Sequence, residues 1–266
     1  MQRIAILFFA LGLASAQDNK QWGPMVLTAI KGLMEWQPRA EGFEYDFQSE
    51  EKKLALDGSL KEQNKVKIAY KEMDGHRWGM VLERNGQPTT EQQRKEQQER
   101  TAARIAAAKS ESESAKEKRR KDAAKKHENN FGFLRDFPDS FEFKLVEKTK
   151  IAGREISVIA FTPRPGYKPS QMRARIFTKV NGKIWLDEAD LQAAKLTAEV
   201  FDDLSLGGVF ANLGKGTYFE FSQTRVENAV WLPDRTYMKV FAKVLLLKSF
   251  NSEETEILTN YRKVKN

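Results

Sequence analysis

Cysteine is absent from this 266-residue sequence, and histidine occurs only at positions 76 and 127. The lack of cysteine excludes disulfide bonds, a thiol nucleophile and a lipidated cysteine, and it is compatible with export to an oxidising compartment. Neither His76 nor His127 lies in an H-E-x-x-H motif or beside another histidine at ligand spacing, which argues against a zinc site. We therefore expect no metal and no cofactor.

The motifs of common catalytic sites are missing as well. No G-x-S-x-G segment is present that would expose a serine nucleophile. Carboxylate pairs such as Asp202 and Asp203 are too common in a sequence that is 31% charged to indicate an acid–base dyad. We therefore predict that the protein is not an enzyme.

One stretch, IWLDEADLQ at residues 184–192, contains the acidic D-E-A-D motif of helicase-type ATPases. Such an ATPase also needs an upstream glycine loop whose lysine binds the nucleotide phosphates. The candidate loop, GGVFANLGKGT at residues 207–217, lies downstream instead, has the wrong glycine spacing, and lacks Ser or Thr after Lys215. We therefore interpret residues 185–190 as the second strand of a hairpin and its exit.

Long hydrophobic runs are equally scarce. Residues 4–13 follow Arg3 and precede Ala14-Ser15-Ala16, an arrangement typical of a secretory signal peptide with an A-x-A cleavage site. This run covers only about half of the roughly 20 residues that a membrane-spanning helix requires. We expect a signal peptide over residues 1–16, a single domain over residues 17–266, and export to the periplasm, with secretion from the cell as the alternative.

Basic residues outnumber acidic ones, 45 to 37, which gives a net charge of +8. In an exported protein this excess favours contact with anionic neighbours such as phospholipid head groups. Solubility alone explains the charge equally well. Nucleic acid is not an expected partner.

Alternating apolar and polar residues predict antiparallel strands from Phe43 to Arg84 and again from Phe141 onwards. A short helix is predicted over residues 22–36, and Pro233 is expected to bend or interrupt a strand. The strongest hairpin signal is Asn181-Gly182, between RARIFTKV and KIWLDEA. Further turns are expected at Asp57-Gly58, Asp74-Gly75, Asn85-Gly86 and Gly153.

A curved antiparallel sheet of about nine to eleven strands encloses more space than its own side chains need to fill. Residues 22–36, or the alanine-rich segment near Ile105, could cover its open side. A dry, filled core is the alternative to a ligand cavity. The aromatic candidates for lining a cavity are Phe161, Phe177, Trp185, Phe219, Phe221, Trp231 and Phe241.

The composition changes abruptly between residues 89 and 130. This segment is rich in alanine and charge, and a continuous helix over Glu91–Glu128 would be about 57 Å long, with a break expected at the SESES run of residues 110–114. It is either a solvated helical excursion or an arm that touches anionic surfaces. The candidates for such contact are Lys116, Lys118, Arg119, Arg120, Lys121, Lys125 and Lys126.

Four segments carry a resemblance to a known family: FTPRPGYKP, GKIWLDEADL, LGKGTYFEF and VWLPDRTYMKV. With the element order, they resemble the LolA/LolB-type periplasmic lipoprotein carriers and the uncharacterised outer-membrane lipoprotein-sorting-like proteins. The resemblance implies a mainly β, α+β fold, a half-open antiparallel β-barrel with a helical lid and an apolar cavity for acyl chains. Residues 89–130 would be a long charged helical insertion in that fold.

Two functional hypotheses follow. The first is a non-enzymatic periplasmic protein that holds acyl chains of a lipid or lipoprotein in the barrel cavity. The second is an envelope stress-sensor or scaffold module of the same fold, whose basic helix engages a protein or an anionic membrane surface.

Overall fold

The structure is a computed structural model that describes residues 20–73, 76–205, 212–244 and 248–264. The expected signal peptide and the expected turn at Asp74-Gly75 lie outside the described residues. No helix within the described ranges is long and apolar enough to cross a membrane.

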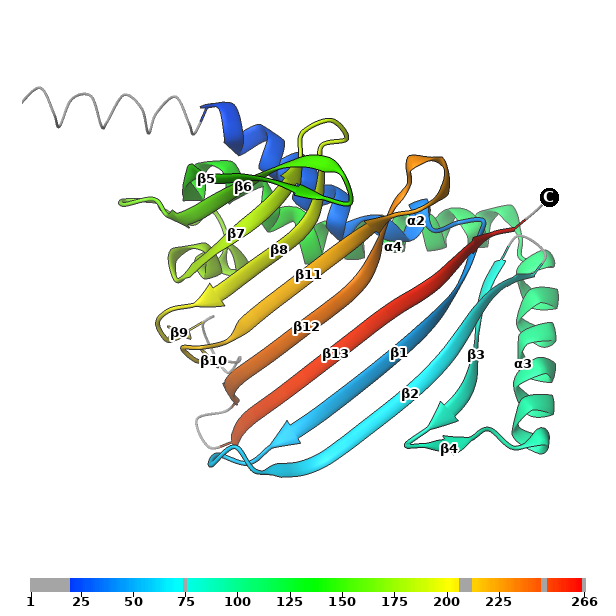
Figure 1. The fold of residues 1–266 in the computed structure, drawn as a ribbon. Coiled ribbons are helices and arrows are strands. Elements are labelled where there is room, and N and C mark those ends of the chain that lie inside the picture. Colours follow the sequence, from blue (N-terminus) through cyan, green and yellow to red (C-terminus); the bar gives the residue numbers. More distant parts are fainter. Residues whose placement is uncertain (1–19, 74–75, 206–211, 245–247, 265–266) are drawn as a thin grey trace, which may run out of the picture.

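The described strands form one antiparallel sheet whose hydrogen-bonded path contains eleven strands, with two more strands beside it (Figure 1). The first and last strands of the path are not paired with each other, so the sheet is open. Along the path the strands are β4 (Gln87–Pro88), β3 (His76–Arg84), β2 (Leu60–Met73), β1 (Phe43–Leu54), β13 (Lys248–Lys263), β12 (Trp231–Val244), β11 (Tyr218–Arg225), β8 (Gln192–Val200), β7 (Val180–Asp187), β6 (Arg154–Pro163) and β5 (Phe141–Ile151).

This open antiparallel sheet with helices confirms the predicted α+β class. The two short strands beside the path are β9 (Leu204–Ser205) and β10 (Asn212–Leu213), and β10 pairs with β12. At the centre of the sheet β1 pairs with β13, with Phe47 opposite Leu258, so the two ends of the described chain meet in one ladder. That pairing brings together segments from near the two ends of the described chain, such as Phe43 and Lys263.

Three of the predicted turns are confirmed. Asn85 and Gly86 both have positive φ angles, 48° and 79°, as a two-residue hairpin turn requires, and they join β3 to β4. Gly153 makes the turn between β5 and β6, and Gly58 makes the turn between β1 and β2. Pro233 lies within β12, beside a bulge in which Asp234 is the extra residue between the Gln223–Pro233 and Ser222–Arg235 pairs, so the strand is bulged there and not interrupted.

The strongest turn prediction was wrong. Asn181 and Gly182 lie inside β7, and the segment predicted as the preceding strand contains a 3₁₀ helix, η2 (Met172–Thr178). A Cβ atom on Gly182 would overlap the Thr197 carbonyl oxygen and the Phe161 ring, so this glycine permits close packing rather than a turn. The β7–β8 turn is made instead by the D-E-A-D stretch, where Leu191 has a φ angle of 50°.

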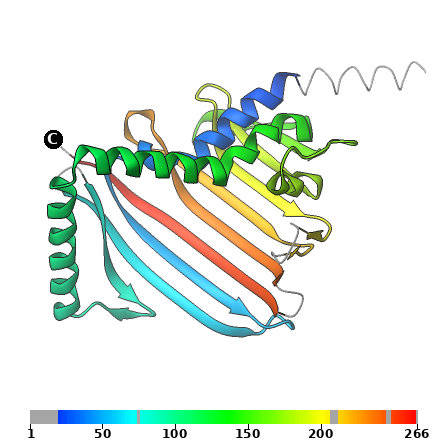
Figure 2. The same ribbon diagram turned by 180° about the vertical axis from the view of Figure 1, so that it is seen from behind.

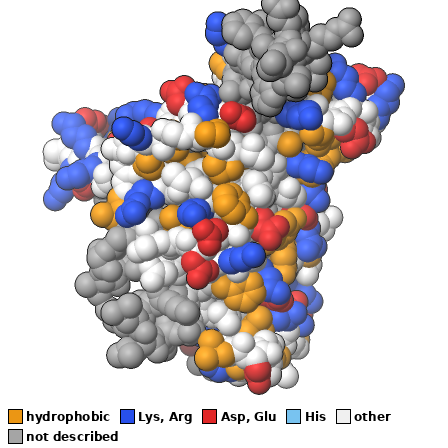
Figure 3. Space-filling model, turned by 90° about the vertical axis from the view of Figure 1, so that its left-hand side faces the viewer, with side chains coloured by type: hydrophobic (Ala, Val, Ile, Leu, Met, Phe, Trp, Pro, Cys, Tyr) orange, Lys and Arg blue, Asp and Glu red, His pale blue; other side chains and the backbone are white. Residues whose placement is uncertain are grey.

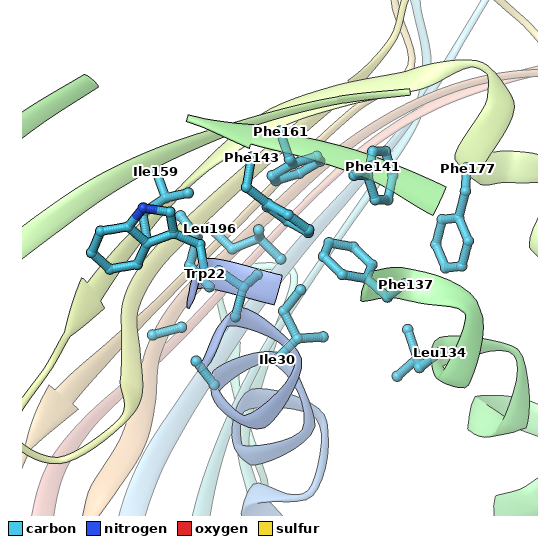
Figure 4. Packing of buried hydrophobic residues seen from close by; sticks show 14 of the residues in the cluster. Trp22, Ile30, Leu134, Phe137, Phe141, Phe143, Ile159, Phe161, Phe177 and Leu196 are labelled. Atoms are coloured by element: carbon cyan, nitrogen blue, oxygen red, sulfur yellow. The ribbon is translucent and has the colours of Figure 1, made fainter. Parts of the chain in front are cut away.

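Helical residues 20–34 confirm the predicted N-terminal helix, and α2 (Trp36–Arg39) follows it. The helix packs its apolar face on β5–β8, together with η1 (Gly132–Asp136) and α5 (Phe137–Ser140) (Figure 4). We call the face of the sheet that carries this helix the inner face and the opposite face the outer face. The side chains at the centre of this core are each at most 6% exposed: Trp22, Val26, Ile30, Leu134, Phe137, Phe141, Phe143, Ile159, Phe161, Phe177, Ile184, Leu186 and Leu196.

The charged segment forms two helices, α3 (Glu91–Lys109) and α4 (Glu113–Phe131), and the chain breaks between them at residues 110–112, as the serines predict. Ile105 of α3 lines a pocket with Trp78 and Met80, which lie on the outer face because the paired Tyr70 and Gly79 alternate with them on the inner face. Of the two segments expected to cover the open side of the sheet, residues 22–36 lie on the inner face and the segment near Ile105 does not. Helix α4 crosses the inner side of the sheet instead (Figure 2).

Candidate functional site

The seven aromatic candidates do not gather in one cavity. Phe161 and Phe177 are 2% and 4% exposed and lie in the core under the N-terminal helix, with Phe221 packed against its margin. Phe219 is half-buried on the inner face, opposite Ala198 of β8 and Met238 of β12.

The other three aromatic candidates lie on the outer face. Trp185 and Trp231 belong to one apolar cluster with Ile156, and the Lys195 ammonium lies 5.5 Å from the Trp185 ring centroid. Phe241 is half-buried, and the Lys239 ammonium lies 5.4 Å from its ring centroid. The alternation of a strand shows which residues share a face, but it does not show which face a helix covers.

Sequence reasoning did not single out the apolar residues that the core leaves uncovered. On the inner face, β11–β12 and β1–β2 carry six half-buried apolar side chains that belong to no apolar core cluster of the described residues. We call them the inner strip: Phe47, Val66, Ile68, Phe219, Met238 and Val240. The alternation of apolar and polar residues in FEYDF and KVKIAY indicates this apolar face, but most side chains of the inner strip are not aromatic and so were not among the aromatic candidates.

Between the two halves of the inner strip, β13 and β1 place acidic side chains on the same face. Glu51 lies directly opposite Glu254, and Glu256 follows two residues along β13. None of these three carboxylates has a hydrogen bond or an ion pair with a described residue. Burial raises the pKa of Glu254, and Glu51 raises it further; burial and then Glu254 raise the pKa of Glu256.

The outer face differs in its electrostatics. There Glu253 pairs with Lys239 at 3.3 Å, and Glu220 pairs with Lys195 at 3.0 Å. Glu50 accepts from Gln63 and pairs with lysines on both sides. The outer-face carboxylates Glu50, Glu220 and Glu253 are thus paired with lysines, whereas Glu254 and Glu256 on the inner face form no ion pair with a described residue. Glu51 interacts electrostatically with Lys53 on the same face, but the ion pair of Lys53 is with Glu62. On the end of the molecule that carries β5–β8, Figure 3 shows hydrophobic side chains scattered among charges of both signs.

Helix α4 passes over the inner face without burying any of its side chains. At its C-terminal end the Nε2 atom of His127 lies 3.3 Å from Oε1 of Glu35, and Arg173 donates to the Asn129 carbonyl. At its N-terminal end Arg119 forms a bidentate pair with Glu111. The helix is therefore held to the rest of the fold near its C-terminal end, whereas the Arg119–Glu111 pair joins α4 only to the residues that connect it to α3.

The seven basic candidates of α4 divide into two groups. Lys116, Arg119 and Lys121 each pair with a glutamate of the same segment. The other four form no ion pair with any described residue: Lys118, Arg120, Lys125 and Lys126. All four are exposed, so they are available to an anionic partner.

Arg39 joins three elements at the other end of the inner face. Its guanidinium donates to the Gly32 carbonyl of the N-terminal helix, to Gln192 of β8 and to Gln223 of β11. All these acceptors are neutral, the Nε atom is buried without a partner, and burial lowers the pKa of Arg39. This residue locks the helix to the sheet, and no sequence motif marks it.

The acidic D-E-A-D stretch is occupied by structural contacts. Asp187 forms a bidentate pair with Arg154, and Asp190 accepts from the Trp231 indole at 2.8 Å and from Arg225 at 3.0 Å. Burial favours a higher pKa for Asp187, but the hydrogen bonds from Arg154 and from the Asp190 N–H outweigh it and lower the pKa. Among the described residues, no group of three or more His, Asp or Glu side chains could hold a metal ion.

No family model and no curated protein matches the sequence. Among solved structures, the fold is similar to a DUF1329 family protein from Desulfovibrio piger, with 9% identity, 90% of this chain and 92% of that chain covered, and a TM-score of 0.29. It is also similar to a putative outer-membrane lipoprotein-sorting protein domain from Vibrio parahaemolyticus, with 11% identity, coverage of 88% and 92%, and a TM-score of 0.28.

A third similar structure is a LolA superfamily protein from Nitrosomonas europaea, with 10% identity, coverage of 90% and 94%, and a TM-score of 0.26. The matched structures thus include the group that the sequence segments resemble.

Proposed function

We propose that this protein is a non-enzymatic binding protein of the bacterial periplasm that holds acyl chains of a lipid or lipoprotein against the inner strip. The observation that carries the proposal is the inner strip itself, which is an apolar surface that no described helix packs upon. Export rests on the expected signal peptide. Phe161 and Phe177 have a structural role in this proposal, because both rings are buried in the core and cannot contact a ligand.

Apolar burial supplies enough free energy for such binding. Transfer of each methylene from water is worth about 0.8 kcal/mol, so a 16-carbon chain has a gross driving force of roughly 12 kcal/mol. Only part of this survives the loss of translational and conformational freedom on association. The two halves of the inner strip, on β11–β12 and β1–β2, suit a ligand with two chains.

A diacylated cysteinyl peptide with a fluorescent label tests the proposal. The double variant Met238→Gln/Val240→Gln replaces apolar side chains of the inner strip by polar ones, and we expect its affinity to fall about ten-fold or more. Tyr237→Gln on the outer face of the same strand is the matched control and should bind like the parent protein. Equal affinity in the double variant and the parent, or no binding by the parent, would exclude the inner strip as the acyl site.

A second function is favoured by the four unpaired cations of α4. In this version the protein is an envelope sensor or scaffold, and Lys118, Arg120, Lys125 and Lys126 engage a protein or an anionic membrane. Each such residue near an anionic surface contributes about 1 kcal/mol, so replacing all four by Gln should weaken binding to phosphatidylglycerol vesicles about 1,000-fold. Salt-independent vesicle binding that survives the replacement would exclude this role for α4.

A further inference from the structure

A pocket of about 360 Å³ lies between α3 and the outer face of β2 and β3, on the opposite side of the sheet from the inner strip. Ligand pockets in proteins are roughly 300–1,000 Å³, so this one has room for a single slender ligand. Its lining residues are Lys71, Trp78, Met80, Gln98, Thr101, Ala102, Ile105, Ala106 and Lys109.

The walls of the pocket are held in place before any ligand arrives. Thr90 and Gln93 form a reciprocal capping box at the start of α3. One turn later the Gln97 side chain accepts from the Val81 N–H at 2.8 Å and donates to the Val81 carbonyl at 3.3 Å. Ile105, 7% exposed, anchors the C-terminal half of the helix. Binding therefore does not have to order the helix.

The lining combines an apolar interior with charge of one sign. Trp78, Met80 and Ile105 supply the apolar side chains, and the two alanines of α3 leave the space that larger residues would occupy. Lys71 is exposed, and none of the described residues that line the pocket is acidic. Four other pockets on the described surface each include an Asp or a Glu.

We propose that this pocket binds one free fatty acid, with its hydrocarbon chain between α3 and β3 and its carboxylate beside Lys71. The charge of Lys71 complements a carboxylate, and the volume suits one chain rather than two. The site goes beyond the proposed function, because it lies on the other face of the sheet and uses α3. It makes the charged helical segment part of a second binding site rather than a solvated excursion.

Isothermal titration calorimetry of the full chain with dodecanoate, below its micelle concentration, tests the site. Ala106→Phe fills the pocket from an exposed helix position, and we expect it to lower dodecanoate affinity at least ten-fold. Ala107→Phe is the matched control, because Ala107 is also exposed on α3 but does not line the pocket. Circular dichroism verifies that both variants keep their helices.

The charge is tested separately with Lys71→Gln and with 1-dodecanol, which has the same chain and no carboxylate. We expect Lys71→Gln to weaken binding of dodecanoate several-fold and to leave binding of 1-dodecanol unchanged. The double variant Met238→Gln/Val240→Gln should bind dodecanoate like the parent. Three results would each overturn the proposal: no binding of dodecanoate by the parent, full affinity in Ala106→Phe, or a loss of affinity only in the inner-strip double variant. If Lys71→Gln weakens binding of dodecanoate and of 1-dodecanol equally, the proposed contact between the carboxylate and Lys71 is wrong.

Discussion

Glu51 of β1 and Glu254 of β13 lie directly opposite each other on the inner face, and neither carboxylate forms a hydrogen bond or an ion pair with a described residue. Like charges directly opposite each other destabilise an antiparallel pair, and partial burial adds to the penalty on the ionised forms. A lysine or arginine beside the carboxylates would offset this cost, as Lys239 does for Glu253 on the outer face of β13. The inner face therefore carries a stability cost that depends on pH.

We expect the free energy of unfolding to contain a pH-dependent term from Glu254 and Glu256. Both pKa values are raised from the ordinary 4.5 in the folded protein, so their contribution is favourable at low pH. It is lost as the pH rises from about 4.5 through the raised values, because the unfolded chain ionises first. Urea unfolding from pH 4 to pH 8 should show this fall in the parent protein and a smaller one in Glu254→Gln/Glu256→Gln.

The control for that titration is Glu253→Gln, which removes a carboxylate that is paired with Lys239 on the outer face. The parent and this control should lose stability in parallel over the same pH range. A double variant whose pH dependence matches that of the parent would show that the two inner-face carboxylates do not carry the term.

Gly182 should be intolerant of any side chain. A Cβ atom there would overlap the Thr197 carbonyl and the Phe161 ring, so Gly182→Ala forces two packed strands apart. We expect a loss of about 1–3 kcal/mol in the free energy of unfolding, measured by urea denaturation. Gly23→Ala is the control, because its Cβ would meet Pro138 at an ordinary 3.5 Å in a helix. Similar stabilities for the two variants would contradict the packing role of Gly182.

Phe141 should be the most costly aromatic side chain to truncate. It is 0% exposed, and its ring centroid lies 4.7–5.4 Å from those of Phe137, Phe161 and Phe177. We expect Phe141→Ala to lower the free energy of unfolding by about 3–5 kcal/mol. Leu56→Ala, at a position that is 78% exposed, should change it by less than about 0.5 kcal/mol. A small loss in Phe141→Ala would mean that the core can collapse around the missing ring.

Gln97 protects the edge of the sheet by bonding both backbone groups of Val81. We expect Gln97→Ala to cost about 1–3 kcal/mol and to speed hydrogen exchange at the Val81 amide. Gln92→Ala is the control, because the Gln92 side chain bonds only to Glu96 on the same helix. Unchanged exchange at Val81 would show that α3 is not held to β3 through this side chain.

The sequence predicted the elements better than their arrangement. Alternation located most of the strands, and the positive φ angles at Asn85-Gly86 were predicted from local chemistry alone. The same chemistry was misleading at Asn181-Gly182, because a glycine that permits close packing of Phe161 and one that permits a turn look alike in a sequence. The helix break at residues 110–112 was predicted because serine competes locally for backbone hydrogen bonds.

The candidate sites depended on contacts between distant segments. Trp185 and Phe177 are both aromatic residues on or beside strands, yet one lies on the outer face and the other in the core. No local pattern states that the N-terminal helix covers β5–β8 and leaves β12 and β1 uncovered, or that Ile105 packs on the outer face.

By itself, the sequence determined that the chain lacks disulfides, forms antiparallel strands with a charged helical segment, and carries no recognisable catalytic motif, because these properties follow from composition and from short-range periodicity. Only the tertiary structure decided which apolar side chains are consumed by the core and which remain available to a ligand. Which side chains are buried depends on the pairing of β1 with β13 and on the face of the sheet on which each helix packs. Burial results from contacts between segments far apart in the chain.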